Sequence, residues 1–569
     1  VEEVRVSTNT IDAGQGRGIA QVQMRTRAGT NAYHGALFYS NNNSALSAND
    51  WFSNLKGAGK SYTNRNQYGG RLGGPIQKNK AFFFVLIDNQ RYVEKVLVTS
   101  TVLTEQARSG VFRYLTGGSV GGTARRNANA FSVTNPSVDV TGNPLIRDDK
   151  GNPLFLNSYN VFTSINDPNR TSIDSTWFSS QFLKRMPLPN DYSVGDGLNT
   201  AGYRWYRRHY GFDGATGQSP NPNRDHLTTR FDYQLNSANK LSFTMTREKD
   251  FGVTGQTGLP DYPNGFFGDV VRKPDFYTVQ HTSVISTSLL NEFRFGFKRD
   301  TWQGVSAFDT GCCFGTAETD LAQSAKDARA TFPKTPDGGL LYVATGLGLG
   351  RYADLNVSTP RLTYSPLRTF ADTLSWNHGA HSIQFGGELD RFYSRGINGG
   401  GAQTTRPLVL LGIAGSSPVP TPTYAGVDPT DSTTARNLLA NLSGSVANIQ
   451  EQFFVNSPTQ KDWTDYRTSI LFTREHHQND WNFFVKDSWK TTRNLTLNFG
   501  VRYDKYGTPY DSLGLGGRFT GGQAGLFGIS GTNFANSMWA PYASSGALTS
   551  TEFVGKHSPQ PDKLIFGND

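Results

Sequence analysis

Few residues in this 569-residue chain have the types and the spacing that chemistry requires. Gly57-Ala58-Gly59-Lys60-Ser61 matches only the end of a phosphate-binding loop, because Asn54 stands where such a loop needs its first glycine. Asp148-Asp149-Lys150-Gly151-Asn152 has the opening of a calcium loop without the closing glutamate. Both motifs are incomplete, so we expect neither a nucleotide site nor a metal site from them.

The two cysteines of the chain, Cys312 and Cys313, are adjacent in sequence. In an oxidising compartment such a pair could form a vicinal disulfide, and the sequence leaves its oxidation state open. A metal site would need further ligands nearby. No Ser/His/Asp set and no pair of carboxylates has a spacing that indicates catalysis. We therefore expect neither an enzyme nor a cofactor.

The composition excludes several classes of protein. Hydrophobic residues make up 36% of the chain and charged residues 18%, with a net charge of +9. No segment approaches the run of about 20 apolar residues that a transmembrane helix needs. A basic balance can indicate nucleic acid as a partner, but the Lys and Arg residues are scattered rather than clustered. We expect no nucleic-acid partner.

Apolar and polar residues alternate with a period of two far more often than with a helical period. Between Asn494 and Asp504, for example, Leu495, Leu497 and Phe499 share one face, while Thr496 and Asn498 share the other. This pattern predicts β-strands with one apolar and one polar face. The predicted strands are Ala32–Ser40, Gln67–Ile76, Ala81–Tyr92, His226–Leu235, Lys240–Glu248, Tyr277–Ile285, Leu289–Arg299, Phe370–Trp376, His381–Ser394, Trp481–Lys490 and Asn494–Tyr506.

The connections between these strands alternate between very short and very long. Tight turns such as Gln77–Lys80 and Asn377–Ala380 join the two strands of each hairpin. The long connections, far above the usual loop of about 4–6 residues, cover about 93–225, 249–276, 300–369, 395–480 and 507–569. Short turns at one end and long extracellular loops at the other are typical of a β-barrel in the bacterial outer membrane.

Aromatic and charged residues support the barrel. Aromatic side chains at strand ends predict girdles at the two membrane interfaces, although strands of soluble sheets also end in aromatics. The girdle residues expected are Trp376, Trp489, Tyr393 and Tyr503. Charges on the polar face, such as Arg230 and Asp232, suit a water-filled lumen better than a soluble core.

Two carboxylates depart from the pattern. Asp372 and Asp487 fall in register with the apolar residues of their strands. If they lie near the membrane interface, the free-energy cost of a carboxylate on the lipid-facing side is small, about 0–1 kcal/mol. A β-bulge that shifts the register is the alternative explanation.

The fold predicted is all-β: a partial transmembrane antiparallel barrel with the C-terminal end of a plug domain. About eleven strands leave the barrel unclosed, so we expect a fragment that holds about half of a large plugged barrel. Residues 1–31 differ in kind, with two short strands around a turn containing Gly14, Gly16, Arg17 and Gly18. We predict that residues 1–31 end the plug and that residues 32–569 begin the barrel.

Several motifs resemble TonB-dependent outer-membrane receptors, and within them the Oar-like group, which carries a carboxypeptidase-regulatory-like domain before the plug. The motifs that carry the resemblance are Val1–Asn9, Arg27–Asn31, Asn66–Ile76, Lys486–Lys490 and Leu495–Asp504. The group usually has a bulky aromatic where Gln15 stands and Lys-Ser where Arg27-Ala28 stand. The resemblance covers the strands and fades in the loops.

The resemblance implies an outer-membrane receptor that binds an extracellular ligand with its long loops and imports it through the plugged barrel. Outer-membrane lipid and, through a plug segment absent from this sequence, the TonB complex would be its partners. The expected ligand-contact residues are Tyr203, Trp205, Arg207 and Arg208, and basic residues in the lumen would favour anionic ligands. The alternative is a surface adhesin or glycan-binding protein without active transport. The ligand is not identified by the sequence.

Overall fold

The structure is a computed structural model dominated by β-strands. It describes residues 2–8, 13–14, 20–55, 59–118, 125–164, 167–210, 223–253, 269–305, 330, 333–336, 338, 341–345, 347–349, 361–397, 407–413, 427–451, 453–460, 462–469 and 471–515. Among these residues, no helix combines the length and the apolar character needed to cross a membrane.

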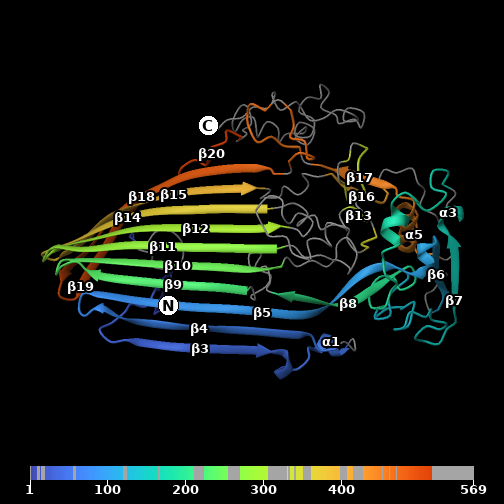
Figure 1. Cartoon of the computed structure of the whole chain (residues 1–569), viewed down its shortest axis with the longest axis horizontal. Helices are drawn as coiled ribbons and strands as arrows, with labels where there is room; N and C mark the ends of the chain where they lie inside the picture. The colour runs from blue at the N-terminus through green and yellow to red at the C-terminus, as the bar shows by residue number, and fades with distance from the viewer. Residues whose placement is uncertain are drawn as a thin grey trace.

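One antiparallel sheet of 13 strands forms the body of the molecule (Figure 1). Its continuous path runs β19-β18-β15-β14-β12-β11-β10-β9-β5-β4-β3, with β8 paired to β5 and β20 to β18 off this path. The strands are β3 (His34–Asn43), β4 (Tyr62–Gln77), β5 (Ala81–Leu103), β8 (Thr200–Tyr210), β9 (Asn223–Gln234), β10 (Asn239–Val253), β11 (Asp269–Ser286), β12 (Leu289–Val305), β14 (Arg361–His378), β15 (His381–Ile397), β18 (Thr473–Thr492), β19 (Leu495–Lys505) and β20 (Tyr510–Asp511).

The eleven strands of the continuous path are the strands that the alternation predicts, which confirms the fold class. Tight turns join them in hairpins at one end of the sheet, at the left of Figure 1. Asn79, in the β4–β5 turn, has φ 64°, and Gly379, in the β14–β15 turn, has φ 60°. Both residue types tolerate this left-handed conformation, which explains why the turns are so short.

The strands are longer than the alternation predicts. β14 begins at Arg361 rather than near Phe370, and β5 continues for 23 residues to Leu103. Only about 9–11 residues of a tilted strand are needed to cross the hydrocarbon. Beyond that length both faces of a strand meet water, so the apolar alternation disappears while the hydrogen-bonded ladder continues.

The two faces of the sheet differ in chemistry. We call the side that carries the apolar residues the outward face and the other side the polar face. Val501 and Phe499 of the outward face are 71% and 57% exposed. Apolar residues stand opposite one another across successive strands: Phe231 with Phe243, Phe243 with Val279, Val279 with Phe295, Phe295 with Phe370, and Phe370 with Leu389. No second sheet covers these residues in the described part of the chain, as expected for a lipid-facing surface.

Asp372 and Asp487 lie in register on the outward face. The ladders β14–β15 and β15–β18 are continuous at both positions, so the β-bulge explanation is wrong. Each carboxylate has a partner on the same face: Asn291 Nδ2 lies 2.9 Å from Asp372 Oδ1, and His381 Nδ1 lies 2.6 Å from Asp487 Oδ2. A hydrogen-bonded carboxylate is much less costly than a solitary one in hydrocarbon.

The sequence predicts irregular long connections, but their described residues contain helices and strands. Parts of three of them pack together beyond the end of the sheet opposite the tight turns, at the right of Figure 1. We call this unit the outer layer. It contains α2 (Glu105–Arg108), β6 (Val111–Gly117), β7 (Leu154–Asn160), α3 (Val161–Ser164), the π-helical turn η2 (Phe178–Leu183), β13 (Tyr342–Thr345), β16 (Leu408–Leu411), α5 (Pro429–Leu442) and β17 (Val446–Gln450).

The outer layer has its own hydrophobic core, in which Phe112, Phe178, Leu349, Leu408 and Leu438 are each at most 2% exposed. These residues come from connections that are far apart in sequence. Burial of each large apolar side chain contributes about 1.5–3 kcal/mol, so the three connections stabilise one another.

The N-terminal residues form a separate hairpin of β1 (Glu3–Thr8) and β2 (Ala20–Arg25), which confirms the two short strands predicted there. Gly14 lies in a turn between them. Gly16, Arg17 and Gly18 lie outside the described residues. Between β3 and β4 the chain also forms the short helices η1 (Ser44–Leu46) and α1 (Trp51–Leu55).

The two faces of β11 should respond differently to a new charge. Val279 faces outward, in the middle of the membrane-spanning part of the strand, whereas its neighbour Gln280 lies on the polar face. We expect Val279→Arg to destabilise the folded protein in lipid vesicles by about 2–4 kcal/mol, because an arginine at the bilayer midplane loses its hydration. Gln280→Arg, the matched control, should cost much less. Equal losses of unfolding free energy for the two variants in urea titrations would contradict the assignment of the faces.

Candidate functional site

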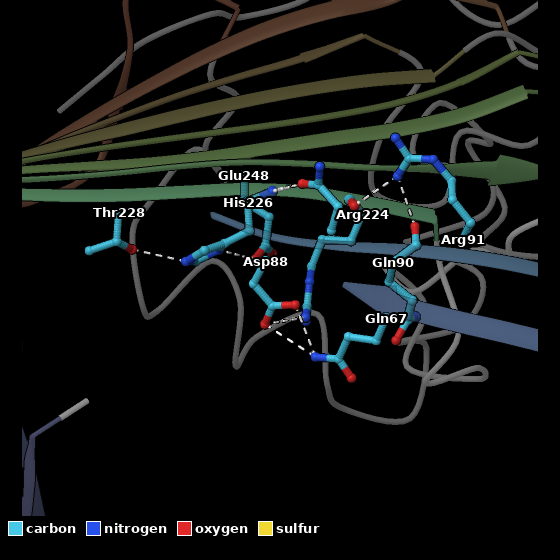
Figure 2. Close-up of polar contacts among 9 residues, drawn as sticks. Gln67, Asp88, Gln90, Arg91, Arg224, His226, Thr228 and Glu248 are labelled. Carbon is cyan, nitrogen blue, oxygen red and sulfur yellow. Dashed lines mark hydrogen bonds and ion pairs between the residues drawn. The ribbon is translucent and has the colours of Figure 1, made fainter. Parts of the chain in front are cut away.

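A network of polar side chains covers the polar face near the outer ends of β9 and β10 and beside them on β4 and β5 (Figure 2). Asp88 on β5 accepts hydrogen bonds from two neighbouring strands. Gln67 Nε2 donates to its Oδ1 over 3.0 Å, and Arg224 Nη2 donates to its Oδ2 over 3.1 Å. The carboxylate therefore ties β4, β5 and β9 together through charge-assisted contacts.

His226 continues the network along β9 and β10. Its Nδ1 lies 2.8 Å from Glu248 Oε2 and its Nε2 lies 2.9 Å from Thr228 Oγ1, which in turn is 3.1 Å from Thr246 Oγ1. A hydroxyl, an imidazole and a carboxylate in this order could form a nucleophilic triad. Thr228, however, pairs with Leu86 of β5 and with Thr246 of β10. The backbone amides that an oxyanion site would need are already hydrogen-bonded between the strands. We therefore interpret the contacts of Thr228, His226 and Glu248 as structural.

Arg91 stabilises the point at which β5 changes partners. β5 pairs with β9 up to Gln90 and with β8 from Val93 onward. Arg91 Nη1 donates to the backbone oxygens of Gln90 and Arg224 over 2.9 and 3.0 Å, and its Nη2 lies 2.5 Å from Asp225 Oδ1 (Figure 2). The guanidinium thus satisfies carbonyl groups at the place where the ladder divides.

Several basic residues on the polar face are paired with carboxylates. Arg230 makes two hydrogen bonds to Asp232, of 2.8 and 2.9 Å. Three further pairs are Arg272 with Asp300, Arg294 with Glu388, and Arg502 with Asp504. Because these charges are locally neutralised, they do not support the expectation that the lumen favours anionic ligands.

The N-terminal segment lies against the polar face at two distant places in the sheet. Arg230 Nη1 on β9 donates to the carbonyl oxygen of Thr26 over 2.7 Å, and Arg502 Nη1 on β19 donates to that of Ala13 over 3.3 Å. Gly29 passes so close to β4 and β5 that a Cβ there would lie 2.4 Å from the carbonyl oxygen of Phe83. Only glycine permits this approach.

The expected ligand-contact residues lie on β8, which pairs with the outer half of β5. Tyr203 and Trp205 stack with ring centroids 5.8 Å apart and pack against the core of the outer layer, so much of their surface is used for packing. Their neighbour Tyr206 is 42% exposed. The side chains of Arg207 and Arg208 lie outside the described part of the structure, and ligand contact at this place stays a prediction.

The four expected girdle residues all lie on the outward face. Trp376 and Trp489 lie near the tight turns, and Trp489 stacks on His381 at 5.4 Å. Tyr393 and Tyr503 lie toward the opposite end of their strands. Cys312 and Cys313 fall outside the described residues. No group of three or more His, Cys, Asp or Glu side chains in the described residues could hold a metal ion.

Asp431 of α5 joins two parts of the outer layer that are remote in sequence. It is 2% exposed, and its Oδ2 accepts a hydrogen bond of 2.8 Å from the backbone N–H of Asn127. Burial raises the pKa of the Asp431 carboxyl to about 7. The outer layer therefore contains a carboxyl group that changes protonation near neutral pH.

The comparison with protein families decides the class of this sheet. The family model for the outer membrane beta barrel domain matches residues 25–552. The chain belongs to this outer membrane beta barrel family. It is therefore an outer-membrane protein, which confirms the predicted location, and the apolar outward face of its sheet is the face that meets lipid. None of the curated proteins matches the sequence.

Several solved structures are similar to the chain at low identity. The outer membrane transporter YddB from Escherichia coli is 10% identical, with 90% of this chain and 43% of that protein covered and a TM-score of 0.39. The siderophore receptor PirA from Acinetobacter baumannii is 9% identical, with 89% and 44% covered and a TM-score of 0.37. The FrpB iron transporter from Neisseria meningitidis is 6% identical, with 86% and 60% covered and a TM-score of 0.26. The chain spans less than half the length of the first two.

The sequence alone did not identify the polar network as a site. Asp88, Arg224, His226 and Glu248 stand at alternate positions of their strands, so the alternation places them on the polar face. Their mutual contacts depend on the register of three neighbouring strands. Arg224 also lies in the region expected to be a loop, where its pairing could not be foreseen.

The Asp431 carboxyl should make the outer layer sensitive to pH. Its folded-state pKa of about 7 lies above the ordinary value of 3.8, so its contribution to stability is full below about pH 4 and is lost as pH rises through 7. We expect Asp431→Asn, which keeps an acceptor for Asn127 N–H, to slow hydrogen exchange in α5 at pH 8 and to leave it unchanged at pH 4. Asp428→Asn at the N-cap removes one of the charges that raise the pKa of Asp431, and its gain at pH 8 should be smaller. Faster exchange of Asp431→Asn at pH 8 would refute the expectation.

Proposed function

We propose that this outer-membrane barrel is part of a receptor that binds a ligand outside the cell and admits it through a plugged lumen. The observation that carries the proposal is the contact of the N-terminal segment with the polar face at both β9 and β19. A segment that reaches across the inside of a wide barrel obstructs it. Long loops above such a barrel are suited to capture the ligand.

The N-terminal segment would be the end of a plug domain. Its contacts with the sheet are hydrogen bonds from arginines and a close approach at Gly29, rather than a large apolar core. Polar contacts in a wet lumen can be exchanged for contacts with water at small net cost. The wall could thus release the segment when a force acts on it, and in TonB-dependent receptors, including the Oar-like group, the TonB complex supplies that force.

The outer layer would be the surface that the ligand first meets. It lies at the end of the sheet opposite the tight turns, which is the extracellular side of an outer-membrane barrel. The region of β8 that includes the exposed Tyr206 provides an aromatic side chain beside Lys95, whose Nζ lies 5.2 Å from the ring centroid. The chemical class of the ligand stays open.

A surface adhesin is the second candidate, and the independent core of the outer layer favours it. A layer that buries Phe112, Phe178 and Leu438 in its own interior keeps its shape without the lumen. Such a unit could present a binding surface with no transport through the barrel. The two functions differ in whether the lumen must open.

Closure of the barrel would need further strands. β3 and β19 end the path of the sheet and do not pair with each other. An open edge in lipid leaves backbone groups without hydrogen-bond partners, at a cost of several kcal/mol for each group. We propose that additional strands of the full-length protein join these two edges.

Conductance would test the plugged lumen in the full-length protein. We expect the intact protein to be closed in planar lipid bilayers, and a variant that lacks the plug through residue 31 to conduct KCl through a wide pore. As a control, Arg502→Ala removes the hydrogen bond from β19 to the carbonyl oxygen of Ala13 and keeps the plug. This variant should stay closed in buffer. A closed deletion variant would contradict the proposal and leave the adhesin.

A further inference from the structure

Positively charged side chains recur at one level of the outward face. On successive strands most of them appear where the apolar residues end, about 9–11 residues from the tight turn, which is the length that crosses the hydrocarbon, and Lys273 and Arg395 lie a few residues farther out. The residues of this basic belt are Arg91, Arg247, Lys249, Lys273, Arg299, Arg368, Arg391, Arg395 and Lys505. At this level, Asp225, Asp275 and Glu475 are the carboxylates that pair with them in the described residues.

The pairing of charges is uneven along the belt. Arg247 and Arg299 share Asp275, and Arg395 lies 3.4 Å from Glu475. Arg368 and Arg391, in contrast, make no ion pair with any carboxylate of the described residues. The basic belt therefore has an unneutralised centre on β14 and β15.

Arg368 and Arg391 stand directly opposite each other across the β14–β15 ladder, and both are exposed. Like charges at directly opposite positions of an antiparallel pair destabilise a sheet. The arrangement becomes favourable when an anion lies between the two guanidinium groups, because each can donate two hydrogen bonds to phosphate oxygens.

A hollow above the two arginines supplies further polar groups. It has a volume of about 290 Å³ and is lined by Arg368, Arg391, Tyr364, Tyr393 and His477, among others. Tyr393 packs on Tyr364 and His477 with ring centroids 6.0 and 4.8 Å away. Hydroxyl and imidazole groups beside two guanidinium groups suit the polar head of a phosphorylated molecule.

A groove below the arginines has the opposite character. The groove has a volume of about 450 Å³. It is lined by the apolar residues Phe243, Tyr277, Val279, Phe295 and Phe297 and by Arg299 and Arg368. The Arg368 guanidinium lies 5.7 Å from the centroid of Phe297 and so stands directly above the apolar wall. The surface therefore offers phosphate ligands above and hydrocarbon contacts below.

We propose that this surface is a binding site for a phosphorylated lipid of the outer leaflet. The phosphate lies between Arg368 and Arg391, and an acyl chain follows the groove toward Val279. The other cations of the basic belt attract neighbouring headgroups. The site depends on the membrane location of the sheet and is independent of any import through the lumen.

The position of the site favours a lipid over a soluble phosphate. The arginines lie at the level where the hydrocarbon ends, so an approaching soluble anion would have to displace headgroups, whereas a membrane lipid already has its phosphate at this depth. An acyl chain in the groove also adds apolar burial that a free phosphate cannot gain.

Native mass spectrometry of the full-length protein in detergent can test the proposal, with lipid A as the probe. We expect Arg368→Gln with Arg391→Gln to weaken binding about tenfold or more, since two charge-assisted hydrogen-bonding groups are lost. Arg368→Lys with Arg391→Lys keeps the charge but loses the paired hydrogen bonds, so its affinity should lie between those of the unchanged protein and the double Gln variant. The matched control, Lys184→Gln with Arg185→Gln, removes the same charge from the outer layer and should bind normally. Equal affinity of the double Gln variant and the control would overturn the proposal.

Two further measurements distinguish a lipid from a free anion. Dephosphorylated lipid A should bind to the unchanged protein as weakly as lipid A binds to the double Gln variant. Val279→Trp should fill the groove and weaken the binding of lipid A. The concentration of inorganic phosphate needed to displace bound lipid A should not change in this variant. If inorganic phosphate displaces lipid A at similar concentrations, the site is one for soluble anions and the proposal fails. The shift in gel mobility on heating, which folded barrels show, confirms that each variant is folded.

Discussion

The structure depends on one constraint: a peptide backbone in hydrocarbon must satisfy its hydrogen bonds within the protein. An antiparallel sheet achieves this between strands, and a strand then places alternate side chains on opposite faces. Phe231, Phe243, Val279, Phe295 and Phe370 thus form one apolar surface, while the intervening positions carry Thr228, Arg230, Asp232 and their partners. The membrane face, the polar lumen wall and the basic belt are consequences of the same alternation.

Outside the membrane the constraint changes, and so does the architecture. The strands continue past the apolar band because the ladder remains favourable in water, and β5 exchanges β9 for β8 at the position that Arg91 stabilises. The connections then fold back on themselves and bury a core of their own. The protein therefore combines a sheet stabilised by lipid with an outer layer stabilised by ordinary hydrophobic packing. The raised pKa of Asp431 predicts that this layer is sensitive to pH.

The sequence was sufficient to predict what depends on local pattern. Alternation and turn residues such as Asn79 and Gly379 located the hairpins and their faces. The outer layer could not be predicted, because its core joins residues such as Phe112, Leu349 and Leu438 from three separate connections. The contact of Asn127 with Asp431 spans 304 residues. The unpaired arginines of the basic belt likewise become visible only when the register places Arg368 opposite Arg391.

Successive residues of one strand should contact lipid and water in alternation. Spin labels at single cysteines along residues 495–504, in full-length protein without Cys312 and Cys313, would measure it through collision rates with oxygen and with a water-soluble nickel complex. Oxygen concentrates in hydrocarbon and the nickel complex in water. We expect high oxygen contact at Leu497, Phe499 and Val501 and high nickel contact at Thr496, Asn498 and Arg502. Rates without a two-residue period, or low values of both at all positions, would contradict it.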